Sequence, residues 1–213
     1  MRIGAALASV VSTMVATGAQ AHPHVWVTAK AEVVHNLFGP ITALNHIWTF
    51  DEGFSAYAVQ GLDTDKDGKY SREELQPLAE VNVTSLREFG YFTTLKSQGK
   101  RAAFEPPKDY WLEHKDGRLV LHFTLPLKAP VEAGSSDVTV DLYDPTFFVA
   151  FTFDKEAPVA LSGAHSGCKA DVQRPAEEEP SASAKLSESF FQSLSASSTF
   201  GAKFANRITV SCR

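Results

Sequence analysis

Apolar and polar residues alternate along much of this chain, which is the pattern of β-strands with one buried face. A first strand is expected at residues 25–33, followed by a turn at residues 36–40 and a second strand at residues 41–50. In the first strand, one face carries Val25, Val27, Ala29, Ala31 and Val33. Further strands are predicted at residues 91–96, 111–115, 118–125, 137–143, 147–153 and 208–212.

Residues 51–90 break this alternation and carry apolar residues at helical spacing. Asp51 is placed to cap a first helix, whose apolar positions are Phe54, Tyr57, Ala58, Gly61 and Leu62. Ser71 and Glu74 form a capping box, which predicts a second helix. Because Pro77 lies beyond the first turn, we expect that helix to be short and kinked. A further segment should then carry Leu78, Val81, Leu86 and Phe89.

Strands of this number and spacing predict an α+β fold that is mainly an antiparallel β-sandwich. The helical residues 51–90 are then an insertion in a single domain of residues 22–213. Residues 174–183 form an acidic, proline-bearing loop, and residues 184–196 carry Leu186, Phe190 and Leu194 at helical spacing. We therefore expect a C-terminal helix followed by a last strand.

The most specific chemical pattern lies at residues 63–74, inside the helical insertion. Asp-Thr-Asp-Lys-Asp-Gly-Lys-Tyr-Ser-Arg-Glu-Glu fills every liganding position of an EF-hand calcium loop. The expected ligands are the side chains of Asp63, Asp65, Asp67, Ser71 and Glu74, and the backbone carbonyl of Lys69. The alternative is an acidic, solvated turn, but such a turn needs neither Gly68 at the sixth position nor Glu74 at the twelfth. We therefore expect Ca²⁺ binding.

The first residues have the features of a secretory signal peptide. Arg2 precedes a weakly apolar run over residues 3–16, and residues 19–21 are a small-residue cleavage site. We expect residues 1–21 to be removed, which leaves a periplasmic protein that begins at His22. No later run approaches the roughly 18 apolar residues of a membrane-spanning helix. A net charge of −5, with scattered lysines and arginines, argues against nucleic-acid binding.

The chain contains two cysteines, Cys168 and Cys212. An oxidising compartment favours a disulfide between them. The bond would close a loop of about 45 residues and stabilise the fold by ~4 kcal/mol on a chain-entropy model. The alternative is a thiolate metal site, which is disfavoured because no pair of histidines lies nearby in the sequence.

Cleavage after residue 21 would place two histidines at the new N-terminus. His22 would offer its amine and its imidazole to one metal ion, and His24 would add a second imidazole. Pro23 has no amide proton, so the amino-terminal copper and nickel motif that needs a deprotonated second amide is excluded. If residues 36–40 make a hairpin, His46 becomes a third candidate ligand. The expected ions are Ni²⁺, Co²⁺, Zn²⁺ or Cu²⁺, and the alternative is that these histidines are ordinary polar residues.

Several segments together resemble one family. They are His-Pro-His-Val-Trp-Val at residues 22–27, His-Ile-Trp-Thr-Phe-Asp-Glu at 46–52, Phe-Ser-Ala-Tyr at 54–57, the loop at 63–74, Tyr-Phe-Thr at 91–93, Tyr-Asp-Pro-Thr-Phe-Phe at 143–148, and the two cysteines. With them, the chain resembles the bacterial Domain of Unknown Function 1007 family over nearly all of residues 22–213. Members are often labelled as the periplasmic component of an uncharacterised ABC-type transport system, and are often encoded beside nickel, cobalt or related permeases.

This resemblance implies an accessory role in transition-metal transport, with a membrane metal permease or ABC transporter as the partner. It directs that role to His22 and His24, and secondarily to His46, Asp51 and Asp144.

Three functions fit these patterns. The first is a periplasmic calcium-binding protein that handles a transition metal near His22 and is not an enzyme. The second is a copper carrier or oxidase with a copper brace at the N-terminal histidine, in which Tyr91 or Tyr143 would lie on the axial side. The third is an interaction module whose calcium site only stiffens the helical insertion. The sequence contains no nucleophile elbow and no paired nucleophile and base.

Overall fold

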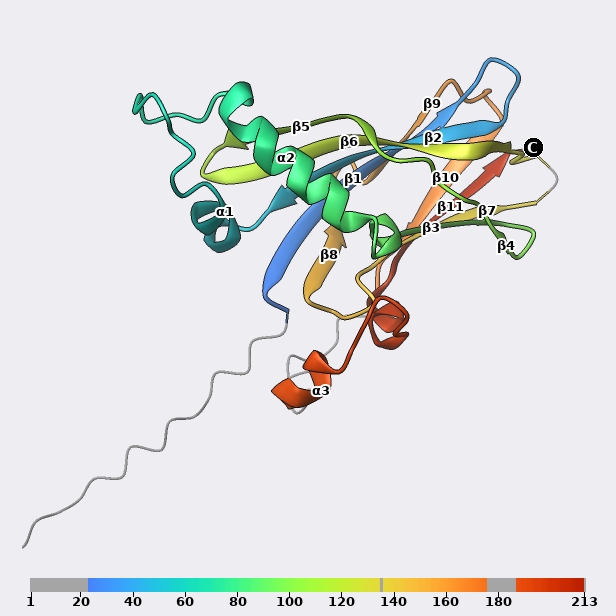
Figure 1. Ribbon diagram of the computed structural model, residues 1–213. Coiled ribbons are helices and arrows are strands. Elements are labelled where there is room, and N and C mark those ends of the chain that lie inside the picture. The colour runs from blue at the N-terminus through green and yellow to red at the C-terminus, as the bar shows by residue number, and fades with distance from the viewer. Residues whose placement is uncertain (1–22, 135, 176–186, 213) are drawn as a thin grey trace, which may run out of the picture.

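The computed structural model describes residues 23–134, 136–175 and 187–212, so the expected signal peptide and His22 lie outside the described residues. Two β-sheets and a few helices make up the fold (Figure 1). Most neighbouring strands are antiparallel. The structure therefore confirms the prediction of two mainly antiparallel sheets with few helices.

The first sheet, sheet A, has the strand order β5-β6-β2-β1-β8, and β9 also pairs with β1. Its strands are β1 (Val25–His35), β2 (Ile41–Phe50), β5 (Lys108–Lys115), β6 (Arg118–Val131), β8 (Val149–Phe153) and β9 (Val159–Ser162). Strands β8 and β9 run parallel to β1, beside residues 25–29 and 31–34 respectively. The first strand of the fold is therefore a central strand of its sheet.

The second sheet, sheet B, is antiparallel and has the order β10-β11-β7-β3-β4. Its strands are β3 (Thr93–Ser97), β4 (Lys100–Arg101), β7 (Val138–Leu142), β10 (Cys168–Gln173) and β11 (Asn206–Cys212). Every predicted strand is present, but the sequence analysis missed β4, β9 and β10. Strands β4 and β9 are too short to show a clear alternation, and β10 carries few apolar residues.

The segment between β2 and β3 is helical, as expected. It contains α1 (Glu52–Ala58), α2 (Arg72–Leu86) and the short 3₁₀ turn η1 (Gly90–Phe92). The prediction of a short helix is wrong, because α2 runs through Pro77 and covers 15 residues. Pro77 removes only the hydrogen bond to the Glu73 carbonyl, and both residues are exposed, so water can replace that bond.

Helix α2 crosses in front of the strands of sheet A, beside sheet B (Figure 1), and packs against β5. Its buried face carries Leu75, Ala79 and Val83, which are spaced one turn apart. Val81, expected in a packed segment beyond the kink, is 61% exposed. An uninterrupted helix places it on the face opposite the buried stripe.

The C-terminal helix is shorter than predicted. Helix α3 covers only Glu188–Gln192, and residues 184–186 lie outside the described residues. The Ser193 hydroxyl donates to the Phe190 carbonyl at 2.6 Å, and the following serine-rich residues favour turns over helix. A second short helix, η3 (Phe200–Phe204), then leads into β11.

A hydrophobic cluster joins the two sheets and α2. Trp48 is 1% exposed, and its ring centroid lies 4.9 Å from those of Phe123 and Phe151. Asn206 is fully buried and connects the sheets: its Nδ2 donates to the Phe151 carbonyl at 2.7 Å. None of the helices among the described residues is long and apolar enough to span a membrane.

Candidate metal sites and adjoining cavities

Three carboxylates come together in the loop between α1 and α2. One oxygen from each of Asp63, Asp65 and Asp67 lies within 4.8 Å of the other two. Hard carboxylate oxygens at this spacing suit a small divalent cation with six to eight oxygen ligands. The structure therefore brings together the first three of the side chains that the sequence assigns to calcium.

The backbone of this loop holds the carboxylates in place. The Gly68 amide donates to Asp63 Oδ2 at 3.1 Å, the Asp67 amide donates to Asp63 Oδ1 at 3.1 Å, and the Lys69 amide donates to Asp67 Oδ1 at 2.7 Å. Gly68 has a φ of +79°, which a residue with a side chain rarely adopts. The glycine thus permits the turn that points its amide at Asp63.

Glu74 closes the loop but lies outside this group of three carboxylates. Its Oε1 accepts from the Thr64 amide at 2.6 Å and hydroxyl at 2.8 Å, and its Oε2 accepts from the Ser71 amide at 2.9 Å. The Ser71 backbone bond, followed by the bonds from Thr64, lowers the pKa of Glu74 to about 2. The Ser71 hydroxyl accepts from the Glu74 amide, so the predicted capping box is present.

The end of the loop is attached to sheet A through aromatic contacts. The Tyr70 and His114 ring centroids are 4.9 Å apart, and the Arg72 guanidinium lies 4.6 Å from the Trp111 ring centroid. His114 and Trp111 both belong to β5. A change in the loop can therefore reach the edge of sheet A directly.

His24 lies at the start of β1, next to a cavity of about 360 Å³. Its backbone amide donates to the Phe148 carbonyl at 2.9 Å, and its ring centroid lies 4.8 Å from that of Phe148. The cavity is also lined by Asp144, Thr146 and Gln192, among others. His24 is therefore an exposed imidazole with a fixed backbone at the mouth of a partly polar cavity.

His46 occupies a different part of the molecule. It is 2% exposed, stacks on Phe123 and pairs with Ala31 of β1 in the sheet register. Burial lowers the pKa of His46 to about 3, so the ring is neutral in the fold. His24 directly precedes β1 and, at the usual rise of a strand, lies about 23 Å from Ala31, the partner of His46. The two histidines therefore cannot share a metal ion. The structure thus does not bring His46 to the N-terminal site that the sequence analysis considered.

Two further carboxylates singled out by the sequence have structural partners. The Asp51 side chain accepts from the Phe54 amide and from the Trp26 amide, each at 2.9 Å. Asp144 is 3% exposed, and its two oxygens accept from the amides of Thr146, Phe148 and Val149. These bonds use the carboxylates to shape their own loops.

The two cysteines form the predicted disulfide. Cys168 and Cys212 are bonded and lie directly opposite each other on β10 and β11. His165 lies near the two sulfurs, but disulfide sulfurs are not thiolate ligands. The structure therefore favours the disulfide over the alternative thiolate site.

Comparison with known proteins places this structure in a family. The model of a family described as "Protein of unknown function (DUF1007)" matches residues 7–212. The chain belongs to the DUF1007 family. The match spans both sheets, the acidic loop and the disulfide.

Two relatives of this DUF1007 protein have names that state no activity. An uncharacterized protein of Haemophilus influenzae is 25% identical over 204 residues, which cover 92% of this chain and 93% of the relative. An "Uncharacterized 15.5 kDa protein in trpE 3'region" of Spirochaeta aurantia is 31% identical over 109 residues, which cover 51% of this chain and 77% of the relative. The function of the DUF1007 protein must therefore be argued from its own sites.

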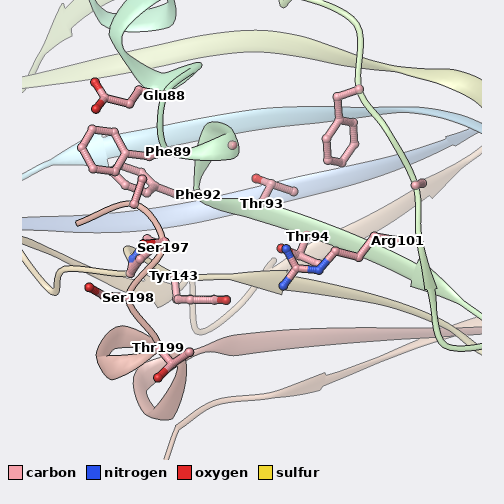
Figure 2. Close-up of a pocket in the computed structure, with 15 residues that line it drawn as sticks. Glu88, Phe89, Phe92, Thr93, Thr94, Arg101, Tyr143, Ser197, Ser198 and Thr199 are labelled. Carbon is pink, nitrogen blue, oxygen red and sulfur yellow. The ribbon is translucent and has the colours of Figure 1, made fainter. Parts of the chain in front are cut away.

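One site was not apparent from the sequence. Gly90, Tyr91 and Phe92 have successive φ values of +60°, +59° and +50°. Left-handed backbone costs a non-glycine residue roughly 1–2 kcal/mol, and such strain collects at functional sites. Phe92 lines both the His24 cavity and a second cavity of about 400 Å³, which Arg101 and Tyr143 also line (Figure 2). No residue spacing in the sequence connects these side chains.

Proposed function

We propose that this DUF1007 protein is an exported calcium-binding protein, with residues 63–74 acting as an EF-hand loop. The observation that carries the proposal is the convergence of one oxygen each from Asp63, Asp65 and Asp67 within 4.8 Å. Ser71, Glu74 and the Lys69 carbonyl complete a ligand set that suits Ca²⁺ by its hard oxygen chemistry. The disulfide supports export, because such bonds are typical of compartments outside the reducing cytoplasm.

In this proposal calcium acts on the fold around the loop. Five carboxylates lie between residues 63 and 74, four of them expected ligands, and a divalent cation would reduce their mutual repulsion. The same segment carries the cap of α2 and the contacts of Tyr70 and Arg72 with β5. Bound calcium would therefore stiffen α2 and its attachment to sheet A.

Isothermal titration of a protein that spans residues 22–213 tests the calcium site. We expect Ca²⁺ to bind with a Kd of about 10⁻³ M or tighter, the range of extracellular EF-hand sites. Glu74→Gln should weaken binding strongly, since glutamine still suits the capping box but lacks the charged, bidentate carboxylate. Glu73→Gln is the matched control, because Glu73 is the exposed neighbour outside the ligand set.

Two results would refute this function. The first is the absence of Ca²⁺ binding at about 10 mM, a concentration roughly tenfold above the Kd of the weakest extracellular EF-hand sites. The second is an equal effect of Glu74→Gln and Glu73→Gln, which would indicate a general response of the acidic surface. If Glu74→Ala lowers only the melting temperature and no partner is affected, calcium has a purely stiffening role in an interaction module.

A second function is favoured by the place of His24. Its exposed imidazole borders a cavity. In a chain processed after residue 21, His22 would be the first residue and would be separated from His24 only by Pro23. We propose that His22 and His24 bind Ni²⁺, Co²⁺, Zn²⁺ or Cu²⁺, as an accessory site beside a membrane metal permease or ABC transporter. His46 has no part in this site, because it is buried in the middle of sheet A, whereas Asp144 lines the same cavity as His24.

Titration of correctly processed protein with each of the four metals tests the second function. His22→Ala, His24→Gln and an extra residue before His22 should each weaken binding, whereas His165→Gln on the exposed β9–β10 connection should not. Failure of all four metals to bind at low micromolar concentration would refute it. Oxygen consumption with Cu²⁺ and a reductant would instead identify a copper oxidase. Tyr143 lines the neighbouring cavity and not that of His24, among the described residues.

A further inference from the structure

The cavity of about 400 Å³ lies where several distant segments meet (Figure 2). Its walls come from the connection between α2 and β3, from β3 and β4, from the end of β7, and from residues 196–199 before η3. A volume of this size is in the range of small-molecule sites. The residues that line it are separate from the calcium loop and do not include His24.

Arg101 supplies the positive charge of this cavity. It is the basic residue among the described lining residues, and the described part of the chain gives its guanidinium no hydrogen bond or ion pair. Figure 2 shows the guanidinium beside Thr94, directed toward the interior of the cavity. A planar guanidinium without a protein partner is suited to bind a carboxylate through two parallel hydrogen bonds.

Hydroxyl groups surround the remaining space. Tyr143, Thr94 and Thr199 line the cavity, and their hydroxyls have no hydrogen-bond partner within the described residues. In Figure 2 the Tyr143 hydroxyl points toward the side of the cavity that holds Arg101. Because a hydroxyl both donates and accepts, this set suits a ligand that carries hydroxyl groups of its own.

Aromatic side chains form the apolar part of the wall. Phe89 and Phe92 lie together on one side (Figure 2), and the left-handed turn at residues 90–92 fixes the direction of Phe92. Apolar rings can cover the carbon skeleton of a ligand whose polar groups face the opposite wall. Glu88 lies at the same end as Phe89, so a second negative charge on the ligand would be repelled there.

We propose that this cavity binds a small hydroxylated carboxylic acid with a single negative charge, of the size of a sugar acid. Arg101 holds the carboxylate, Tyr143 and Thr94 bind hydroxyl groups, and Phe92 covers the carbon skeleton. Neutral sugars lack the group that Arg101 recognises, and phosphate lacks the carbon skeleton and carries more charge. The site is independent of calcium and of the N-terminal histidines.

Calorimetric titration of the protein of residues 22–213, without added Ca²⁺, tests the proposal with D-glucuronate, D-gluconate, D-glucose and inorganic phosphate. We expect at least one of the two acids to bind, with glucose and phosphate at least about tenfold weaker, since a hydrogen bond to a charged group is worth about a factor of ten or more. Arg101→Gln should weaken acid binding at least about tenfold, and Tyr143→Phe should weaken it severalfold.

Lys100→Gln is the matched control, because Lys100 is the exposed neighbour of Arg101 in β4 and does not line the cavity. It should leave acid binding unchanged, and circular dichroism should show that all three variants are folded. The proposal is overturned if neither acid binds at 10 mM, if glucose or phosphate binds as well as the acids, or if Arg101→Gln and Lys100→Gln have the same effect. These results leave the calcium titration unaffected, so the two proposals fail separately.

Discussion

Asp51 and Trp26 are joined by two hydrogen bonds at the point where α1 leaves sheet A. The Asp51 amide donates to the Trp26 carbonyl at 2.9 Å, and the Trp26 amide donates to Asp51 Oδ2 at 2.9 Å. The other carboxylate oxygen caps α1 through the Phe54 amide. One side chain therefore sets both the end of the β1–β2 pair and the start of the helix that leads to the acidic loop.

Replacing Asp51 should destabilise the fold through the loss of its two side-chain hydrogen bonds, from the Trp26 amide and from the Phe54 amide. We expect Asp51→Ala to lower the free energy of unfolding by about 1–3 kcal/mol, because it removes a helix cap and a partner of the Trp26 amide. Asp51→Asn should cost less, since its single carbonyl oxygen can still cap α1. Urea denaturation measures both values. Equal values for the two variants would contradict the role of the Asp51 side chain as the cap of α1.

Asn206 offers a test of how the two sheets are connected. Asn206→Ala leaves the buried Phe151 carbonyl without its donor, so we expect a loss of about 2–3 kcal/mol in the free energy of unfolding. Thr209→Ala on the same strand should cost less than about 1 kcal/mol, because its side chain is half-buried and bridges no sheets. Thermal or urea denaturation of both variants would decide this, and similar losses would argue against the bridge.

The disulfide should contribute strongly to stability. The double variant Cys168→Ala with Cys212→Ala should be less stable by about 2–5 kcal/mol, because the unfolded chain gains the freedom of the opened loop. Urea denaturation under non-reducing conditions measures the difference. An unchanged midpoint would show that the pairing of β10 with β11 does not depend on the bond.

His46 should make the fold sensitive to acid. Its pKa is about 3 in the fold and 6.5 in an exposed histidine, so above pH 6.5 the ring is neutral in both states and the full stability is present. As the pH falls below 6.5, the unfolded chain takes up a proton that the folded chain does not, and stability decreases. By pH 4 the loss from this one residue should reach roughly 3 kcal/mol.

Urea denaturation between pH 7 and pH 4 measures this loss. His46→Leu should flatten the dependence, because leucine fills the site between Phe123 and Trp48 without a titrating group. His165→Gln removes an exposed histidine and should leave the slope as it is in the parent protein. A slope that persists in His46→Leu would assign the acid sensitivity to the carboxylates instead.

The sequence predicted the parts of this structure that depend on local patterns. Alternation located the long strands, and the spacing of Asp63, Asp65 and Asp67 located the grouped carboxylates. The wrong prediction of a short helix at Pro77 has a local cause as well. Pro77 lies in an exposed second turn, where solvent compensates for the missing amide, and the rule that proline ends a helix does not take this solvent into account.

Features that depend on chain topology could not be predicted in this way. Residue spacing suggested that His46 could reach the N-terminus, but the register pairs it with Ala31 in the middle of β1. Arg101 and Tyr143 are far apart in the sequence and face one cavity only because β4 and β7 belong to the same sheet. Tyr143 begins one of the segments that resemble the family and Arg101 lies in none of them, so the structure alone places the two side chains at one cavity.

The central position of β1 also has a consequence for folding kinetics. A chain that emerges with its N-terminus first, from a ribosome or an export channel, presents β1 long before its neighbours β8 and β9. Val25 can pair with Val149 only after the chain up to β8 has emerged, so a contact of very high sequence separation is needed to complete sheet A. Until then, an apolar strand edge is exposed, and the nascent chain is most vulnerable to aggregation and to capture by chaperones.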